Sequence, residues 1–197
     1  MSTAIFGGTF DPVHTGHVKM VCSVLEQFEP ERIIIVPNAN PPHKKNEVST
    51  DYTHRLNMLC LAFEDIDRVE ISDYESENDR YYYSIDTMRY FRNLYGEDTR
   101  MIIGGDSLKQ IHHWYKYEDF LKENKFIVFC RDYTDETEKV IEYYRTEGVD
   151  ILVSDMPFTD VSSTEIRKQL SEGDLRKGFL PEKVIGYIRA NSLYGGK

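Results

Sequence analysis

Two histidines near the amino terminus stand at a spacing suited to phosphate chemistry. A short apolar run ends in Gly7 and Gly8, and His14 and His17 follow at the start of a helical pattern. Glycines let a backbone approach a phosphate closely, and a helix N-terminus presents free N–H groups at the positive end of its dipole. Three residues apart on a helix, the two histidines would lie on one face. This stretch predicts a phosphate site with two side-chain donors, and hence nucleotide chemistry.

A second candidate segment is the loop over residues 37–45, which reads Pro-Asn-Ala-Asn-Pro-Pro-His-Lys-Lys. Its prolines make the loop stiff, and Lys44 is a point charge suited to a phosphate oxygen. Taken alone, the segment is as easily an ordinary basic surface loop. Its place after the second predicted strand, facing the first turn, favours a functional role.

A third segment, 160–167, reads Asp-Val-Ser-Ser-Thr-Glu-Ile-Arg. Ser162 with Glu165 three residues later predicts a capping box at a helix start. The same helix end would gather N–H groups, hydroxyls and the guanidinium of Arg167, which together make a second anion site. The two roles are compatible, and we expect both.

The elements that position these segments follow from the hydrophobic pattern. The continuous apolar run Ile33–Val36 suits a strand buried on both faces of a parallel sheet. Strands are expected to end at Phe6 and to span 32–36, 69–71, 100–103, 125–129 and 150–153, with helices over 18–28, 51–63, 84–95, 138–145, 162–172 and 181–190. This alternation predicts a Rossmann-like α/β fold, a mostly parallel sheet with helices on both faces. We expect a single domain over 1–197, with 162–197 as its C-terminal helical part.

In such a sheet, ligands bind beyond the carboxyl ends of the strands, near the point where the strand order reverses. Gly7-Gly8, the loop from Pro37, Gly104-Gly105-Asp106 and Arg131 each follow a predicted strand. We therefore expect these four segments to converge on one rim of the sheet.

Composition sets the outer limits. The 197 residues include 40% hydrophobic and 13% aromatic side chains, which indicates a globular protein, and the net charge of −10 disfavours non-specific nucleic-acid binding. We expect no signal peptide, no membrane span and a cytoplasmic location. Cys22, Cys60 and Cys130 are expected to be buried free thiols, forming neither a disulfide framework nor a zinc site. The acidic stretch 73–79 is expected to be a solvated loop, and the sequence assigns no role to residues 73–80.

With these segments identified, the chain resembles a known family over nearly its full length. Neither a dinucleotide fingerprint nor a P-loop is present, but Gly-Thr-Phe-Asp-Pro leads into His-Thr-Gly-His. This pattern resembles the H-x-G-H nucleotidyltransferase superfamily and, within it, the bacterial nicotinate-nucleotide adenylyltransferases. The matching stretches are 7–17, 37–44, Arg55 with Met58-Leu59, 83–87, 103–108, Trp114, 162–167 and 184–194. Gly105 stands where the family commonly has alanine, and Val161 where isoleucine is usual.

The resemblance implies a reaction in which ATP and nicotinate mononucleotide give deamido-NAD and pyrophosphate. The mononucleotide phosphate would attack the α-phosphorus of ATP directly, with no general base and no covalent intermediate. Mg²⁺ would bridge the phosphates, with no ligand from protein side chains. The implied partners are these two small molecules, with neither nucleic acid nor membrane, and with a possible homo-oligomer.

The resemblance also implies roles for particular residues. Those implied in catalysis are His14, His17, Lys44 and Arg167. Those implied to bind ATP are Gly7, Gly8, Thr9, Phe10, His14, His17, Gly104, Asp106, Arg131, Ser163, Thr164 and Arg167. Those implied to bind the mononucleotide are Asn38, Lys44, Ser84, Thr87, Leu108 and Trp114, with the Trp114 indole stacked on the pyridine ring.

Two alternatives stay open at this point. One is a sister enzyme on the same scaffold, a pantetheine-phosphate adenylyltransferase or a cytidylyltransferase with another phosphate acceptor. The other is a nucleotide-binding sensor that has kept the pocket and lost turnover. A sensor would be expected to lose His14, His17 or Lys44, and all three are present.

Overall fold

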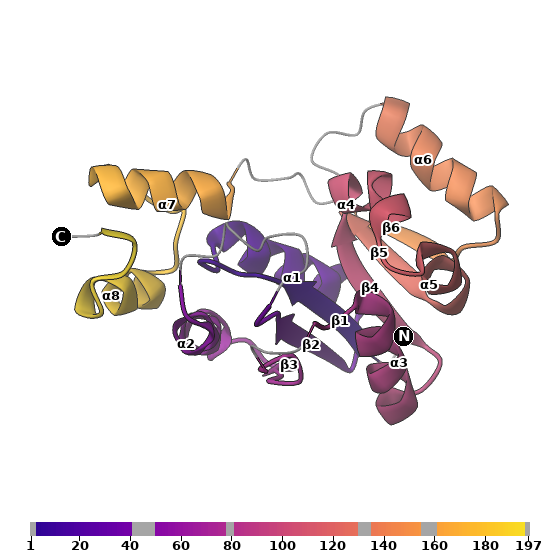
Figure 1. The fold of residues 1–197 in the computed structure, drawn as a ribbon, viewed down its shortest axis with the longest axis horizontal. Coiled ribbons are helices and arrows are strands. Elements are labelled where there is room, and N and C mark those ends of the chain that lie inside the picture. Colours follow the sequence, from indigo (N-terminus) through magenta and orange to yellow (C-terminus); the bar gives the residue numbers. More distant parts are fainter. Residues whose placement is uncertain (1–2, 41–49, 78–80, 130–134, 155–160, 196–197) are drawn as a thin grey trace.

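A parallel sheet forms the centre of the fold. The computed structural model describes residues 3–40, 50–77, 81–129, 135–154 and 161–195. Its strands are β1 (Thr3–Gly8), β2 (Arg32–Pro37), β3 (Val69–Ile71), β4 (Thr99–Gly104), β5 (Lys125–Phe129) and β6 (Ile151–Ser154). They lie in the order β3-β2-β1-β4-β5-β6, and every neighbouring pair is parallel (Figure 1). The predicted Rossmann-like sheet is confirmed.

The predicted helices are present with small shifts at their ends. They are α1 (Thr15–Phe28), α2 (Tyr52–Phe63), α3 (Ser84–Tyr95), α6 (Asp135–Thr146), α7 (Ser163–Glu172) and α8 (Glu182–Ala190). The structure adds α4 (Gly105–Lys109), α5 (Tyr117–Glu123) and the 3₁₀ turns η1 (Ile111–His113) and η2 (Leu193–Gly195). These elements are too short for a helical hydrophobic period to be visible. No helix in the described ranges is long and apolar enough to cross a bilayer.

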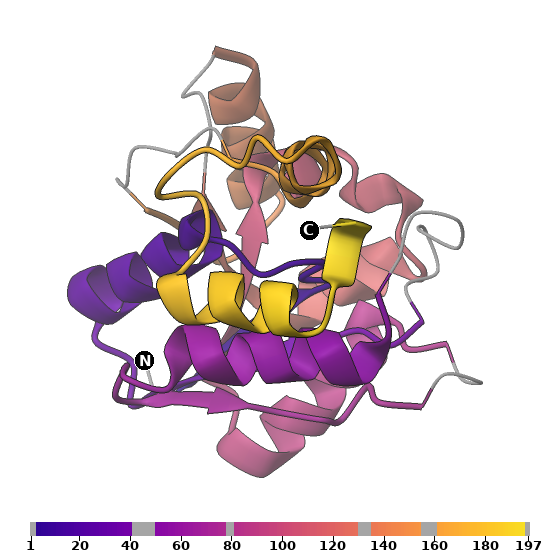
Figure 2. The ribbon, with the colours of Figure 1, turned by 90° about the vertical axis from the view of Figure 1, so that its left-hand side faces the viewer.

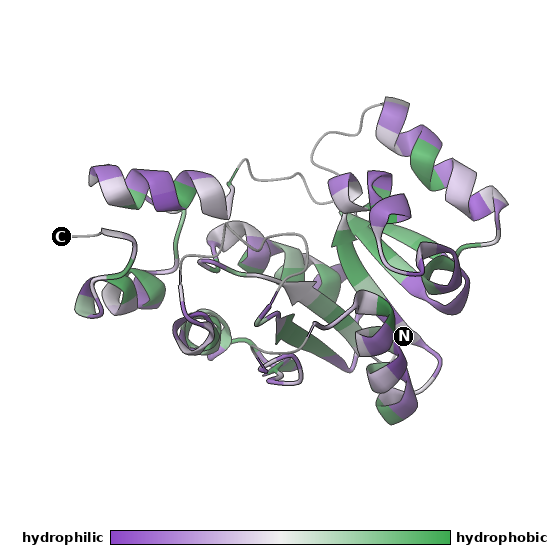
Figure 3. Cartoon of the chain, viewed as in Figure 1, coloured by the Kyte–Doolittle hydropathy of each residue, from purple (hydrophilic) through white to green (hydrophobic). Residues whose placement is uncertain are grey.

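Alternation along β1 divides the interior into two cores. Ala4 and Phe6 belong to a core shared with α1, α2, α7 and α8. Ile5, between them, belongs to a second core that includes residues of α3, α4, α5 and α6. The strands are accordingly the most continuously apolar elements (Figure 3), as expected of a sheet covered on both faces.

The cysteine prediction is wrong for Cys60. On α2 the neighbouring Leu59 faces the core, so Cys60, one position further round the helix, is exposed. Cys22 is half-buried, both thiols are free, and Cys130 lies outside the described residues.

The C-terminal helices pack against the amino-terminal half. Helix α8 runs alongside α2 (Figure 2), where the Tyr187 hydroxyl lies 2.9 Å from His54 Nδ1 and accepts a hydrogen bond from Asn57 at 2.9 Å. The Lys183 ammonium pairs with Asp65 at 2.6 Å. The last turn, η2, brings the Tyr194 hydroxyl within 2.5 Å of an Asp11 carboxylate oxygen. The end of the chain thus helps to hold the turn after β1.

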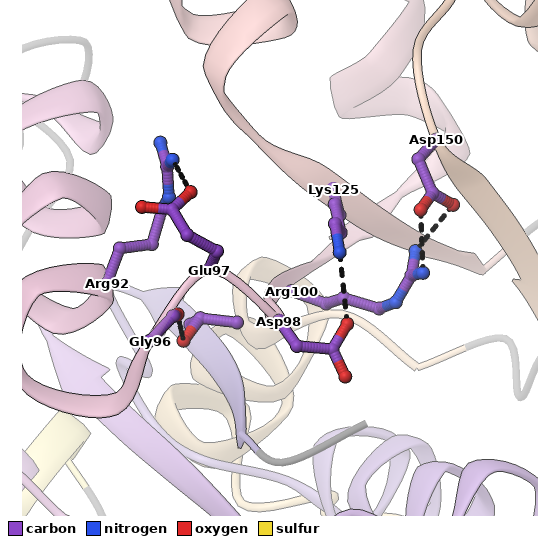
Figure 4. Close-up of polar contacts among 8 residues, drawn as sticks. Arg92, Gly96, Glu97, Asp98, Arg100, Lys125 and Asp150 are labelled. Carbon is purple, nitrogen blue, oxygen red and sulfur yellow. Dashed lines mark hydrogen bonds and ion pairs between the residues drawn. The ribbon is translucent and has the colours of Figure 1, made fainter.

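The amino ends of the strands carry structural ion pairs. The Arg100 guanidinium forms a bidentate ion pair with the Asp150 carboxylate at 2.7 and 2.8 Å, and the Lys125 ammonium pairs with Asp98 at 3.1 Å (Figure 4). Asp98, Lys125 and Asp150 lie at or just before the first residues of β4, β5 and β6, and Arg100 is the second residue of β4, so all four lie at the edge opposite the strands' carboxyl ends. These ion pairs link the starts of β4, β5 and β6 to one another.

A buried arginine ties together the loops that follow β1 and β2. Arg55 of α2 is only 1% exposed, and burial lowers its pKa. Its guanidinium donates to the carbonyl oxygens of Thr9 (2.7 Å), Asn38 (2.8 Å), Thr50 (3.1 Å) and Ala39 (3.4 Å). One side chain therefore fixes the backbone after β1 and after β2, the two strands that the first crossover of the sheet connects.

Replacing Arg55 should be strongly destabilising. In Arg55→Ala, the four backbone carbonyl oxygens would lose the guanidinium that donates to them. The free energy of unfolding should therefore fall by roughly 3 kcal/mol or more. Urea unfolding measures this loss. The matched control is Arg89→Ala, which removes an exposed pair with Glu123 and should cost far less. Equal losses in the two variants would contradict the role assigned to Arg55.

Candidate active site

A cavity of about 480 Å³ opens at the carboxyl ends of β1 and β4. These strands lie side by side although two strands and three helices separate them in the chain, so the strand order reverses here. The cavity is lined by the end of β1, the first turn of α1, the amino ends of α3 and α4, and the segment around Trp114. The rim predicted for ligand binding is where the structure places its cavity.

The two histidines cap helix α1 reciprocally. His14 is the N-cap residue, and its Nδ1 accepts from the His17 N–H at 3.3 Å. In return, His17 Nδ1 accepts from the His14 N–H at 3.2 Å, and the two rings stack with centroids 3.6 Å apart. An accepting Nδ1 carries no proton, so this arrangement needs both rings neutral with the proton on Nε2. Both residues line the cavity. In this tautomer each ring keeps one Nε2–H group that can donate a hydrogen bond.

Two glycines of the motif leave the space that the rings of His14 and Phe10 occupy. A Cβ on Gly16 would lie 2.9 Å from His14 Nδ1, so the N-cap ring can pack over the helix start only because Gly16 has no side chain. A Cβ on Gly8 would lie 2.8 Å from the Phe10 ring. That ring in turn meets His17 edge-on at 5.0 Å. The glycines thus shape the turn by making room for its own side chains.

Helix α7 is joined to the same turn from outside the cavity. The Arg167 guanidinium donates to the Asp11 carbonyl at 2.7 Å and contacts Thr164 Oγ1 at 3.4 Å. The Ser163 hydroxyl donates to the Pro12 carbonyl at 3.0 Å, and Ser162 caps the helix by accepting from the Glu165 N–H at 3.2 Å. The predicted N-cap at Ser162 is present, but the Glu165 carboxylate accepts from Gln169 Nε2 at 2.9 Å and does not complete a capping box. Helix α7 thus supports the turn after β1 from behind.

The opposite side of the cavity contains a buried carboxyl group. Glu75 is 6% exposed, and its two oxygens lie 2.6 Å from Asn38 Nδ2 and 2.5 Å from Thr87 Oγ1. Burial raises the pKa of this carboxyl group to about 7, against a smaller lowering by the two hydrogen bonds. The prediction of a solvated acidic loop is therefore wrong for Glu75, because tertiary partners from the loop after β2 and from α3 enclose it.

Aromatic and polar groups complete the lining. Trp114 is half-buried and lies beside Phe120 at a ring separation of 5.6 Å, while Tyr115 next to it is 48% exposed. Asp106, at the start of α4, has an exposed side chain with Lys109 Nζ at 3.8 Å. The cavity therefore offers an indole, a carboxylate and the buried Asn38–Glu75–Thr87 cluster opposite the histidines.

The structure brings most of the predicted site residues together. Those lining the cavity are Gly7, Gly8, Thr9, Phe10, His14, His17, Asn38, Ser84, Thr87, Gly104, Asp106 and Trp114. Ser163, Thr164 and Arg167 do not line it and stand behind the turn, while the Leu108 side chain is fully buried in the second core. Lys44 and Arg131 lie outside the described residues. Sequence reasoning missed Glu75, and it noted Arg55 as a match to the family without assigning it a role.

The raised pKa of Glu75 should make stability depend on pH. Between its ordinary pKa of 4.5 when unfolded and about 7 when folded, only the folded chain holds the proton, so wild-type stability should fall as pH rises through this window. Glu75→Gln has no such titration. From pH 5 to pH 8, the wild type should lose roughly 2–3 kcal/mol relative to this variant in urea unfolding. Glu77→Gln, two residues along and exposed, is the control. A pH-independent difference for Glu75→Gln would contradict a raised pKa.

Comparison with known proteins agrees with this geometry. A family model described as cytidylyltransferase-like matches residues 5–169. The probable nicotinate-nucleotide adenylyltransferase of Clostridium tetani is 38% identical over 198 residues, covering 97% of this chain and 98% of the relative. The corresponding protein of Thermotoga maritima is 38% identical over 196 residues, covering 98% and 92%.

Solved structures share the fold. Plasmodium falciparum nicotinic acid mononucleotide adenylyltransferase complexed with NaAD superposes with a TM-score of 0.80 at 22% identity, covering 100% of this chain and 98% of that one. The same enzyme complexed with APC gives a TM-score of 0.81 at 20% identity, with the same coverage. At this identity the likeness supports the fold, while the closer sequence relatives identify the family. The chain belongs to the cytidylyltransferase-like nucleotidyltransferases and, among them, to the nicotinate-nucleotide adenylyltransferase family.

Proposed function

We propose that this protein transfers the adenylyl group of ATP to nicotinate mononucleotide, giving deamido-NAD and pyrophosphate. The observation that carries the proposal is that the reciprocal His14–His17 cap and Trp114 line one and the same cavity. The histidines offer N–H donors for phosphates, and Trp114 offers an indole face for a planar ring. Family membership at 38% identity over nearly the whole chain adds its support.

The reaction needs positioning more than acid–base chemistry. A phosphate oxygen of the mononucleotide, already an anion near neutral pH, attacks the α-phosphorus of ATP as the bond to the β-phosphate oxygen breaks and pyrophosphate leaves. Negative charge on the α-phosphoryl oxygens must be stabilised as this happens. The Nε2–H groups of His14 and His17 are suited to that task because the cap has already set their tautomer and orientation. No proton needs to move.

Other cations of the chain complete the proposed phosphate site. Lys44 would hold the mononucleotide phosphate or bridge it to the triphosphate, and Arg131 would contribute to the ATP site. Arg167, Ser163 and Thr164 would meet the β- and γ-phosphates from α7. The Arg167 guanidinium has five N–H donors, more than its contacts with Asp11 and Thr164 use.

Mg²⁺ would enter bound to ATP. The polar groups at the histidine end are N–H donors, which suit anions and not a metal ion, so the residues fit the phosphates and leave Mg²⁺ to phosphate oxygens and water. When bound, the ion would neutralise charge on the departing pyrophosphate.

The acceptor end would select the pyridine nucleotide. Trp114 would stack on the pyridine ring, and Asp106 would hold a ribose hydroxyl. Donors near Ser84 and Thr87 would meet the nicotinate carboxylate, where an amide nitrogen would be unfavourable. Leu108 would contribute through its backbone alone, because its side chain is buried.

A comparative assay tests the function and the acceptor together. With ATP and Mg²⁺, pyrophosphate release should be most efficient with nicotinate mononucleotide, weaker with nicotinamide mononucleotide and absent with phosphopantetheine or without an acceptor. Preference for phosphopantetheine would indicate the sister activity. ATP binding without release of pyrophosphate from ATP in the presence of any acceptor would indicate a sensor and would contradict the proposal.

Removing His17 tests the charge-stabilising role. His17→Ala should lower kcat by roughly 10²–10³-fold, the usual cost of losing one preorganised donor to a developing anion. The helix keeps the cap from His14 to the backbone N–H of residue 17, so the circular dichroism spectrum should be unchanged. His113→Ala removes an exposed imidazole and should leave kcat as it was. Near-normal turnover of His17→Ala would exclude His17 from the mechanism.

A further inference from the structure

We infer that Glu75 is a positioning residue for the mononucleotide half of the site, holding Asn38 and Thr87 in the orientation that meets the acceptor. The inference rests on the proposed function, because it assigns the acceptor to this side of the cavity. It adds a residue that contacts other side chains of the site, from a segment whose sequence indicates only a charged loop.

Glu75 joins three separate segments. Its side chain contacts Asn38, which follows β2, and Thr87 in the first turn of α3. Its backbone carbonyl also accepts from the Ala39 N–H at 3.0 Å. Residues 38 and 87 are far apart in sequence, and this carboxyl group lies between their side chains. Removing it would release both.

The contact with Glu75 determines which way the Asn38 amide points. Asn38 Nδ2 is directed to Glu75, and the backbone carbonyl of Asn38 is held by Arg55, so the side-chain oxygen must point elsewhere. That oxygen, Oδ1, is buried and has no hydrogen-bond partner among the described residues. A buried acceptor of this kind favours a donor from the ligand, and a mononucleotide has ribose hydroxyls to offer. A flipped amide would present N–H groups in its place.

The uncharged carboxyl group completes one chain of hydrogen bonds. Asn38 Nδ2 and the Thr87 hydroxyl each donate to one oxygen of Glu75. When that carboxyl group is protonated, its O–H can donate to Thr87 Oγ1 instead, and the Thr87 hydroxyl can turn to the Tyr83 carbonyl, 3.3 Å away. A glutamine at position 75 would supply the same groups: a carbonyl for Asn38 and an N–H for Thr87. An alanine would supply neither. The Gln and Ala variants therefore separate hydrogen bonding from charge.

Steady-state kinetics with each substrate varied in turn provides the test. Glu75→Ala should raise the KM for nicotinate mononucleotide at least about tenfold and change the KM for ATP by less than about twofold. Glu75→Gln should stay within about threefold of the wild type for both substrates. Glu77→Ala, an exposed acidic residue of the same segment, is the control and should change neither KM.

A second variant covers the case in which Glu75→Ala does not fold. Thr87→Val keeps the shape of the side chain and removes its hydroxyl, so it breaks the same chain of bonds from the other end. It should raise the KM for the mononucleotide about threefold or more, with the KM for ATP unchanged. Where both variants fold, their combined effect should be less than the product of the separate effects, because both remove one network.

The outcomes separate this inference from the proposed function. Wild-type turnover of nicotinate mononucleotide together with an unchanged KM in Glu75→Ala, or in Thr87→Val where that variant alone folds, would overturn the inference alone. Equal increases in both KM values, or a Gln variant as impaired as the Ala variant, would likewise overturn it. Absence of wild-type turnover with nicotinate mononucleotide would overturn the proposed function and the inference with it.

Discussion

The buried guanidinium of Arg55 is the constraint on which the geometry of the site depends. Loops after parallel strands have few backbone partners of their own, and here carbonyl groups from the turn after β1 and the loop after β2 converge on one donor group. A lysine could not replace it, because a single ammonium group lacks the several separated N–H donors of the planar guanidinium. Because Thr9 leads into the histidine turn and Asn38 into the Glu75 cluster, one side chain sets the distance between the two halves of the cavity.

Within that frame, each half of the site is built so that its polar groups are already oriented. Where we propose that phosphates bind, the capping box uses both Nδ1 atoms and leaves the ring protons on Nε2. Where we propose that the acceptor binds, Glu75 fixes an amide and a hydroxyl. The C-terminal part then closes the turn from behind, through Arg167 on the Asp11 carbonyl and Tyr194 on its carboxylate. Preorganisation of this kind is what a reaction without proton transfer requires of its enzyme.

Local patterns predicted the parts of this structure whose causes are local. Strand β2 is recognisable because Ile33–Val36 is continuously apolar, and the site rim follows because conspicuous residues come directly after strands. Arg55 is one of the matches to the family, and its position one helical turn before the inward-facing Leu59 could have indicated that it is buried. Glu75 had no such signal: it stands between Asp73 and Glu77, both exposed, and its burial arises from Asn38 and Thr87, which the fold brings to it. The roles of Ser163 and Arg167 are similar, since their contacts with the first turn cross most of the chain.

The balance of charge explains why a buried carboxyl group can belong to a site for anions. The chain carries a net charge of −10, and both proposed substrates are anionic, so an ionised Glu75 beside the acceptor would oppose binding. Burial is unfavourable for the carboxylate and raises its pKa to about 7, so that near neutrality a large share of the group is uncharged. The same desolvation that makes Glu75 costly to ionise therefore lets it act as a hydrogen-bonding link between β2 and α3. A bound anion nearby would raise that pKa further, so binding of the acceptor and protonation of Glu75 should reinforce each other.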